Sequence, residues 1–260
     1  MSTALVTGAT AGIGLEFARQ LAEKGHDIVL VARDRARLEN VSDDLRRTFG
    51  VETEILVADL ADRAQVGKVA ERLDDDARPV DLLVNNAGFA LGRSFLHNDV
   101  EVEEQLFDVL CRAVLVLSHA AANAMRRRGH GAIVNVSSIA GFAAMGTYSA
   151  AKSWVTVFSE GLATELSGSG VSVMALCPGF VRTEFHDRAR LNMAALPDRL
   201  WLEAPVLVRR ALDDLNRGRV VSVPGVQYRA LVALMRAMPR TAVRGTSGSL
   251  HRRRRTAGDA

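Results

Sequence analysis

Tyr148 and Lys152 are a pair of residues whose types and spacing could do chemistry. They stand four apart in a helical pattern, so their side chains share one face and can touch. A phenol has a pKa of about 10, and a neighbouring ammonium stabilises the phenolate and lowers that value. Ser138, at the end of the preceding predicted strand, could donate to a developing oxyanion. The three residues predict proton exchange with a substrate oxygen; a surface Tyr–Lys helix pair is the alternative.

A glycine-rich turn, Thr7-Gly8-Ala9-Thr10-Ala11-Gly12-Ile13-Gly14, follows the first predicted strand and opens the first predicted helix. Glycines there permit backbone angles that a Cβ forbids and let a phosphate come close to the chain. The helix N-terminus supplies unpaired N–H groups and a partial positive charge for a pyrophosphate. The turn predicts a dinucleotide-binding loop, with a tight turn that binds nothing as the alternative. Beside Tyr148 and Lys152, it predicts hydride transfer between a nicotinamide ring and a carbonyl or alcohol. The cationic ring of the bound cofactor would then act with Lys152 to lower the pKa of Tyr148.

The end of the second predicted strand indicates which dinucleotide is bound. That is where the adenosine ribose is recognised, and the chain has Ala32 there, followed by Arg33. A guanidinium binds a phosphate with two parallel hydrogen bonds. The sequence therefore favours NADP(H). NAD(H) stays an alternative because Asp34 follows, and an acid at this place can accept hydrogen bonds from the ribose 2′-hydroxyl and repel a 2′-phosphate. Asp34 could instead be only the N-cap of the next helix, paired with Arg33 or Arg37.

Short runs rich in Val, Ile and Leu alternate along the chain with longer helical patterns. The predicted strands are apolar almost throughout, which is typical of strands covered on both faces. This alternation predicts right-handed crossovers and an α/β, doubly wound parallel sheet (Rossmann fold) in a single domain, residues 1–240. The predicted strands are Thr3–Thr7, Asp27–Ala32, Glu52–Ala58, Val80–Val84, Ala132–Ser137, Val171–Leu176 and a weaker Arg219–Val223. The predicted helices are Ile13–Lys24, Asp34–Phe49, Asp62–Asp76, Val100–Arg128, Thr147–Leu166, Pro205–Arg217 and Val226–Met238.

Six ordered motifs make the chain resemble the short-chain dehydrogenase/reductase family from about Thr3 to Arg240. They are the turn Thr7–Gly14 (TGxxxGxG), Asp59-Leu60, Asn85-Asn86-Ala87-Gly88, Ser138, Tyr148-Ser149-Ala150-Ala151-Lys152 and Pro178-Gly179-Phe180-Val181-Arg182-Thr183. The resemblance implies that Ser138, Tyr148 and Lys152 are catalytic. Together with Arg33, the expected cofactor-binding residues are Gly8, Thr10, Gly12, Ile13, Gly14, Asp59, Leu60, Asn86, Ala87, Gly88, Tyr148, Lys152, Pro178, Gly179, Val181 and Thr183. No metal is expected.

The resemblance also implies individual roles. Asp59 would hydrogen-bond the adenine and Leu60 flank it, Asn85 would steady the central strands, and Thr183 would bind the nicotinamide carboxamide. Lys152 would also hold the nicotinamide ribose hydroxyls. The family's usual tetramer would rest on the helices at Val100–Arg128 and Thr147–Leu166, so a homo-oligomer, dimer or tetramer, is expected. From the residues alone, Asn85 and Asn86 could equally form a strand-end turn, and Thr183 an N-cap.

Two departures from the family pattern stand out. Leu110 occupies the place of an asparagine that opens the helix there and anchors a water linking the lysine to solvent. A leucine side chain cannot hydrogen-bond a water, so the proton relay would be rerouted, slowed or absent. Ser138 and Tyr148 are only ten residues apart, a shorter spacing than is usual in the family. The loop between them should leave one wall of the substrate cleft more open.

The segment Glu184–Trp201 would fold over the substrate as a lid in the resembled family. Its apolar residues would set specificity or simply pack in a core; they are Phe185, Leu191, Met193, Leu196 and Trp201. The helix predicted at Val226–Met238 has Leu231, Leu234, Met235 and Met238 on one face. We prefer the interpretation that it packs on the body, over contact with a neighbouring subunit or a membrane surface.

Composition and charge narrow the class of protein. With 48% hydrophobic residues the chain is expected to be a soluble globular protein. Two cysteines cannot form a disulfide framework, and neither a signal peptide nor a run of 18 apolar residues is visible, so a cytoplasmic location is expected. From Arg240 onward six arginines face one acid, a net charge of +5 that leaves −2 for residues 1–239. Residues 241–260 are therefore expected to be a solvated, disordered tail.

Three classes of function remain in view. The first is a reductase or dehydrogenase acting on a moderately apolar carbonyl or alcohol. The second is a nucleotide-binding regulator that kept the fold and lost turnover, for which Leu110 is the only support. The third is a nucleic-acid binder using the arginine-rich tail; it ranks last, because the rest of the chain has no basic stripe with interleaved aromatic residues, so no nucleic-acid partner is expected.

Overall fold

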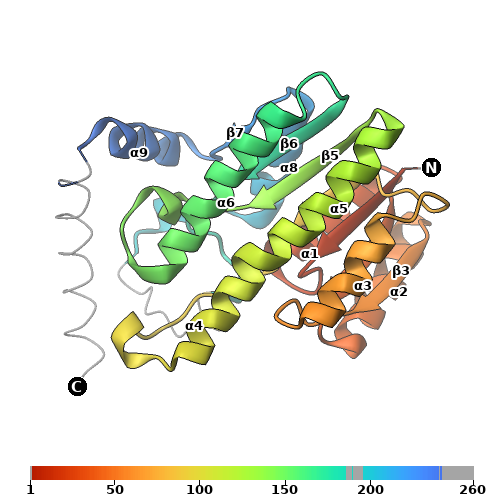
Figure 1. Ribbon diagram of the computed structural model, residues 1–260, viewed down its shortest axis with the longest axis horizontal. Helices are drawn as coiled ribbons and strands as arrows, with labels where there is room; N and C mark the ends of the chain where they lie inside the picture. The colour runs from red at the N-terminus through yellow and green to blue at the C-terminus, as the bar shows by residue number, and fades with distance from the viewer. Residues whose placement is uncertain (1, 186–188, 190–195, 240, 242–260) are drawn as a thin grey trace.

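The structure, a computed structural model, describes residues 2–185, 189, 196–239 and 241. Its centre is a seven-stranded parallel sheet in the order β3-β2-β1-β4-β5-β6-β7 (Figure 1). The strands are β1 (Thr3–Thr7), β2 (Asp27–Ala32), β3 (Thr53–Val57), β4 (Leu82–Asn85), β5 (Gly131–Val136), β6 (Val171–Leu176) and β7 (Val221–Ser222). The predicted doubly wound α/β fold is confirmed, with strand bounds within two residues of those expected.

Helices cover both faces of this sheet (Figure 1). Helices α1, α2 and α8 pack on one face, and α3, α5 and α6 on the other. Successive residues of β1 and β2 point into opposite clusters, as Ala4 and Leu5 do. This explains why the strands are apolar at nearly every position rather than at every second one. The helices are α1 (Gly12–Glu23), α2 (Arg35–Phe49), α3 (Arg63–Leu73), α4 (Val100–Phe107), α5 (Ala113–Arg128), α6 (Gly146–Glu165), α8 (Ala204–Asn216) and α9 (Val226–Ala237).

Local chemistry fixes several helix ends. The carboxylates of Asp34 and Asp62 accept from the main-chain N–H groups of Arg37 and Gln65, which caps α2 and α3. Helix α2 ends at Gly50, whose φ of 70° is costly for a residue with a Cβ. Three 3₁₀ turns lie between the longer elements: η1 (Phe95–His97), η3 (Ile139–Phe142) and η4 (Asp198–Leu200).

The long helix predicted at Val100–Arg128 is helical throughout but not α-helical throughout. A π-helical segment, η2 (Asp108–Arg112), joins α4 to α5. By length and composition this 29-residue helix could cross a membrane, yet half of its most apolar window is buried inside the protein. It lies against α3 and α6 and along the sheet, as the core helix of a globular fold does.

Candidate active site

The predicted site residues gather at the carboxyl ends of the central strands. The strand order turns there: β1 leads to β2 on one side and β4 adjoins it on the other. Ligands of doubly wound sheets bind at this reversal point. The glycine turn follows β1, Asn86 to Gly88 follow β4, Ser138 follows β5, and Pro178 follows β6.

The glycine turn has the backbone geometry that the sequence predicts. Gly8 and Gly12 have φ values of 66° and 54°. A Cβ on Gly14 would come within 2.3 Å of both Gly8 O and Asn86 Nδ2, so only glycine fits. Ala11, the N-cap of α1, provides no side-chain hydrogen bond. The N-cap residue therefore does not cap the first N–H groups of α1 with its side chain. These N–H groups can donate to a bound phosphate.

Asn86 and Thr7 hold this turn against the end of β4. The Asn86 amide donates to Thr7 O at 2.9 Å, and Thr7 Oγ1 accepts from the main-chain N–H groups of Asn86 (2.9 Å) and Ala87 (3.0 Å). Asn86 therefore forms the strand-end turn that was the alternative prediction, and it does so beside the glycine turn.

Arg33 and Asp59 face each other where an adenosine would lie. Arg33 Nη1 is 4.0 Å from Asp59 Oδ2, and the Arg33 side chain is 72% exposed, free to turn toward a phosphate. Asp59 Oδ1 accepts from the main-chain N–H of Ala61, which orients the carboxylate. Asp34 is indeed an N-cap, and it pairs with Arg37 rather than Arg33. Arg33 thus keeps its guanidinium at the predicted position.

Ser138, Tyr148 and Lys152 meet as predicted. A hydrogen bond joins the side chains of Ser138 and Tyr148, and Lys152 Nζ lies 5.8 Å from the centre of the Tyr148 ring. Ser138 Oγ also accepts from the main-chain N–H of Ala140, which fixes its rotamer. Lys152 Nζ donates to Val136 O at 2.7 Å. The arrangement can exchange a proton at the phenolic oxygen.

The predicted lowering of the Tyr148 pKa depends on the cofactor's cationic ring as well as on Lys152, and in the protein without dinucleotide the shift has the opposite direction. Burial raises the pKa of Tyr148 to about 12, and the hydrogen bond with Ser138 opposes that rise. Burial also lowers the pKa of Lys152 to about 8. Removal of both groups from water favours their neutral forms. Tyr148 is therefore a protonated phenol at neutral pH.

Two hydroxyl groups that the sequence reasoning missed fasten α6 to the sheet. Ser137 Oγ donates to Lys152 O at 2.6 Å and contacts Thr156 Oγ1 at 2.8 Å. Gly141 of η3 packs so closely that a Cβ would lie 2.9 Å from the main chain of Lys152. Ser137 directly precedes Ser138, so the strand end holds both the serine and the lysine segment in place.

Asn85 steadies the central strands, as expected. Its amide donates to Asn135 Oδ1 at 2.9 Å and to Ser118 Oγ at 3.1 Å, while Asn135 Nδ2 donates to Ser159 Oγ at 3.0 Å. All four side chains are buried. The network ties β4 and β5 to α5 and α6, and a buried polar network of this kind favours a single arrangement of its elements.

Leu110 lies within the π-helical segment η2 and is 1% exposed. It packs with Leu106, Cys111 and Ala151, and the partly buried Tyr148 adjoins this cluster. The helix is thus π-helical rather than α-helical around Leu110, although leucine replaces the asparagine of the family pattern. The leucine adds apolar surface beside the lysine where the family places an amide.

The segment after β6 returns to the glycine turn. Pro178 O accepts from the main-chain N–H of Ile139, and Val181 forms a short bridge with Leu202. The Thr183 side chain would contact a Cβ on Gly12 at 3.1 Å, so it borders the turn. Thr183 Oγ1 also accepts from the main-chain N–H of Phe185, the capping role named as its alternative.

Tyr228 of α9 supports this segment from behind. A Cβ on Gly179 would lie 2.2 Å from the Tyr228 ring, so Gly179 is required here by packing. The Tyr228 hydroxyl accepts from Phe180 N at 3.2 Å and donates to Leu200 O. No pattern in the sequence predicts this contact.

Apolar side chains form the walls around Tyr148. Phe89 and Leu91 pack on the Leu110 cluster, and the Phe185 ring lies 6.1 Å from the Tyr148 ring. Leu191 and Met193 of the predicted lid, and the tail from residue 242, lie outside the described residues. Within the described ranges, no group of three His, Cys, Asp or Glu residues could hold a metal ion.

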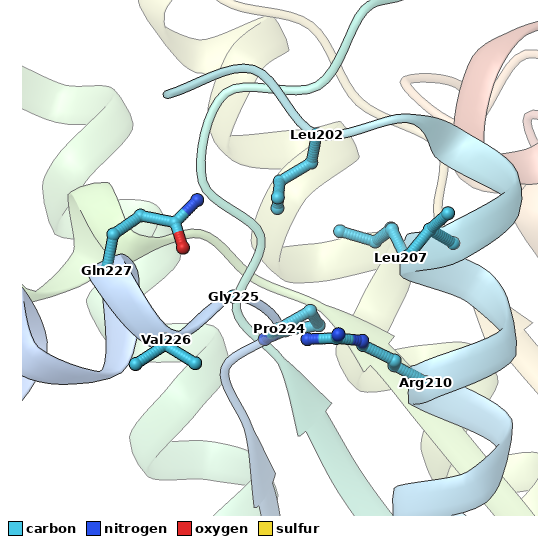
Figure 2. Close-up of a pocket in the computed structure, with 8 residues that line it drawn as sticks. Leu202, Leu207, Arg210, Pro224, Gly225, Val226 and Gln227 are labelled. Atoms are coloured by element: carbon cyan, nitrogen blue, oxygen red, sulfur yellow. The ribbon is translucent and has the colours of Figure 1, made fainter. Parts of the chain in front are cut away.

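A separate pocket of about 200 Å³ lies away from these residues. Leu202, Arg210 of α8 and Gln227 of α9 are among the residues that surround it (Figure 2). None of the predicted site residues lines this pocket, so its chemistry is not that of the candidate active site.

Comparison with known proteins agrees with this geometry. The short chain dehydrogenase family model matches residues 2–194. A short-chain dehydrogenase from Sphingobium yanoikuyae in complex with NADPH is 38% identical, with a TM-score of 0.83 over 92% of this chain and 96% of that chain. The bulky-bulky ketone specific alcohol dehydrogenase from Comamonas testosteroni is 30% identical, with a TM-score of 0.79 over the same shares.

A curated relative gives the same family. The NADP-dependent 3-hydroxy acid dehydrogenase of Escherichia coli K12 is 36% identical over 186 residues, 70% of this chain and 73% of that protein. The chain therefore belongs to the short-chain dehydrogenase family and is an oxidoreductase. Its NADPH-bound and NADP-dependent relatives favour NADP(H) as the cofactor.

Proposed function

We propose that this protein reduces an apolar ketone or aldehyde with NADPH and that Tyr148 donates the proton. The carrying observation is the hydrogen-bonded Ser138–Tyr148 pair with Lys152 beside the ring, at the same sheet edge as the glycine turn. A tyrosine–lysine pair on an exposed helix surface would lack both the serine and the dinucleotide turn.

The residues of the turn fit a dinucleotide. Gly8, Gly12 and Gly14 let the turn pack closely against Asn86 and Thr183. The uncapped start of α1 offers N–H groups to the pyrophosphate. Asp59, held by Ala61, is placed for the adenine, and Thr183 for the carboxamide. NADPH, when bound, supplies the hydride that is transferred to the substrate carbon.

The chain's own residues manage the proton. Ser138 donates a hydrogen bond to the substrate oxygen and holds it near Tyr148. Tyr148 then gives its proton to that oxygen as negative charge develops there. With its pKa at about 12 before the cofactor binds, the phenol is protonated at neutral pH and so holds the proton that reduction requires. Lys152, fixed by Val136 O, stabilises the phenolate that remains.

The substrate class follows from the apolar side chains near Tyr148. Phe89 and Leu91 pack with Tyr148 on the Leu110 cluster, and the Phe185 ring lies 6.1 Å from the Tyr148 ring. Apolar neighbours of this kind favour a bulky, uncharged carbonyl compound. The Comamonas relative is named for bulky-bulky ketones, and the Escherichia coli relative for 3-hydroxy acids. We place this protein nearer the first, because apolar walls do not compensate a substrate carboxylate.

The preference for NADP(H) over NAD(H) rests on Arg33. Its guanidinium stands beside Asp59 and is largely exposed. A 2′-phosphate would give it a doubly charged partner in place of a carboxylate at 4.0 Å.

We also propose that the protein is a cytoplasmic homo-oligomer. Exposed apolar residues on α4, α5 and α6 support the subunit contact. Phe107, Leu115 and Val157 are 56%, 45% and 64% exposed. These helices are the ones that the family resemblance associates with subunit contact. A second chain packed there would remove this surface from water.

The test is the oxidation of NADPH or NADH by the purified protein with a panel of aryl ketones, aldehydes and 3-oxo acids. We expect NADPH oxidation with the ketones and little with the acids. NADPH binding with no turnover on any member of the panel would favour the regulator instead. Salt-dependent binding to nucleic acid would favour the third class of function.

A further inference from the structure

Glu103 of α4 is a buried acid that the proposed mechanism does not use. It is 8% exposed, and its two carboxylate oxygens accept hydrogen bonds from two other segments of the chain. Oε2 accepts from the hydroxyl of Thr147 at 2.5 Å, and Oε1 accepts from the side-chain amide of Asn98 at 2.7 Å. Both bonds orient the carboxylate, because a buried oxygen that loses its donor is left without a partner. Glu103 therefore fastens the start of α6 and the loop before α4 to one point.

Thr147 lies in the first turn of α6, directly before Tyr148. The N-cap residue of this helix is Met145, whose side chain forms no capping hydrogen bond. The first N–H groups of a helix have no partner inside it, so a start without a side-chain cap frays more readily. The carboxylate of Glu103 compensates for the missing cap, because it holds Thr147 and lies near the positive end of the helix dipole.

Apolar side chains continue this contact between α4 and α6. Leu106, one turn after Glu103, packs in one buried cluster with Leu110 and Ala151. The partly buried Tyr148 adjoins the same cluster. The hydrogen bond of Glu103 is thus the polar end of an otherwise apolar contact, and it lies at the end nearest the start of α6.

The next turn of α6 has a separate anchor. Ser137 Oγ donates to Lys152 O at 2.6 Å, one helical turn after Tyr148. This bond holds the lysine segment but does not fix the turn that carries the phenol. That task falls to the contact between Glu103 and Thr147.

We propose that Glu103 is a positioning residue that acts through Thr147 and keeps Tyr148 where its phenol meets Ser138 and the substrate oxygen. This inference rests on the proposed function of Tyr148 as the proton donor. Without the contact, the first turn of α6 would fray and the phenol would leave Ser138 for part of the time. A displacement of about 1 Å at a reacting group can lower a rate about 100-fold.

Thr147→Val and Thr147→Ser are a matched pair of variants, since valine keeps the shape and removes the hydroxyl, and serine keeps the hydroxyl. Thr147→Val should lower kcat with an aryl ketone about 10- to 100-fold and leave the dissociation constant of NADPH within about threefold of wild type. Thr147→Ser should keep kcat within about threefold. Glu103→Leu should resemble Thr147→Val, and the double variant should be no slower than either, because all three lose one contact. Thr164→Val removes a hydroxyl bound to Glu160 O at the other end of α6 and is the control with unchanged kcat.

Hydrogen exchange of the dinucleotide-free protein gives a second measurement that needs no turnover. The main-chain amides of residues 150–152 are the first that bond within α6. They should exchange about fivefold faster in Thr147→Val than in wild type, and at the wild-type rate in Thr147→Ser and Thr164→Val.

Three results would overturn the proposal: unchanged kcat in Thr147→Val, an equal loss of kcat in Thr147→Ser, or unchanged exchange of residues 150–152 in Thr147→Val. An equal loss in both variants would show that shape at this position matters and the hydroxyl does not. If wild type reduces no ketone, the proposed function fails, and the exchange rates alone decide whether Glu103 holds the first turn.

Discussion

The side chain of Leu110 lies directly against Gly88: a Cβ atom on Gly88 would come within 2.7 Å of Leu110 Cδ2 and 3.8 Å of Lys152 Nζ. Leu110 is buried in the π-helical segment. A side chain on Gly88, a glycine assigned to the cofactor groove, would therefore have to displace the end of the buried Leu110 side chain. Leu110, which departs from the family pattern, thus lies against Gly88, which keeps that pattern.

Gly88→Ala should weaken NADPH binding about 5- to 20-fold, because the new methyl group meets a buried leucine and displaces either it or the groove. The dissociation constant from nicotinamide fluorescence measures this. Leu110→Ala in the same chain should recover most of the affinity by opening space for the methyl group. If the free-energy effects of Gly88→Ala and Leu110→Ala on NADPH binding simply add in the double variant, the two residues do not act together.

Tyr148→Phe should lower kcat at least about 1,000-fold and leave the dissociation constant of NADPH within about threefold, since it removes the proton donor and keeps the ring. Stopped-flow and steady-state assays with an aryl ketone give both values. Lys68→Met, an exposed lysine of α3 far from the strand ends, is a control that should leave kcat unchanged. Substantial turnover by Tyr148→Phe would remove the assigned role.

Arg33→Ala should raise the dissociation constant of NADPH about 10- to 100-fold and that of NADH less than about threefold, because a charged hydrogen bond to phosphate is lost only with the first. Arg35→Ala is a neighbouring exposed control whose ion pair is with Glu39. Equal weakening of both dinucleotides by Arg33→Ala would show that the guanidinium does not bind the 2′-phosphate.

Lys152 should reduce the stability of the dinucleotide-free protein in a pH-dependent way. Burial lowers its pKa from 10.5 to about 8, so between these values the native state binds fewer protons than the unfolded state. The penalty is fully present below about pH 8 and disappears as the pH rises toward 10.5. The difference corresponds to about 3 kcal/mol, part of which the hydrogen bond to Val136 O offsets.

Lys152→Met should therefore be about 1–2 kcal/mol more stable than wild type at pH 7 and lose this advantage by pH 10, while turnover falls sharply. Urea unfolding at both pH values measures the difference. Burial raises the pKa values of Tyr148, Cys111 and Cys177, whose contributions to stability change with pH in the opposite direction. Subtraction of the two proteins removes the part of these contributions that does not depend on Lys152. A less stable variant at both pH values would refute this account.

Most of the fold could be predicted from the sequence because its signals are local. Apolar runs, glycine stops and Asp N-caps placed the six longer strands within two residues. The π-helical segment at Asp108–Arg112 could not be foreseen, since those residues continue the helical pattern. β7 is only two residues long because only Val221 and Ser222 pair with β6, a limit set by tertiary contact.

The candidate site was predictable where sequence spacing alone sets the distance between side chains, as it does for Tyr148 and Lys152, one helical turn apart. The supporting contacts were not. Asn85 and Asn135 are 50 residues apart, and Gly179 and Tyr228 meet only after folding. The raised pKa of Tyr148 in the dinucleotide-free protein could not be predicted, because spacing reveals a nearby ammonium but not how much water the fold removes from the phenol.

The most direct test follows the hydride with an isotope and removes the proposed proton donor by substitution. NADPH carrying deuterium at the transferable C4 position is incubated with an aryl ketone, and the product alcohol is analysed by mass spectrometry. The account predicts one deuterium on the carbinol carbon with wild type, and no product from Tyr148→Phe although it still binds NADPH. An alcohol without deuterium, or equal labelled product from both proteins, would contradict it.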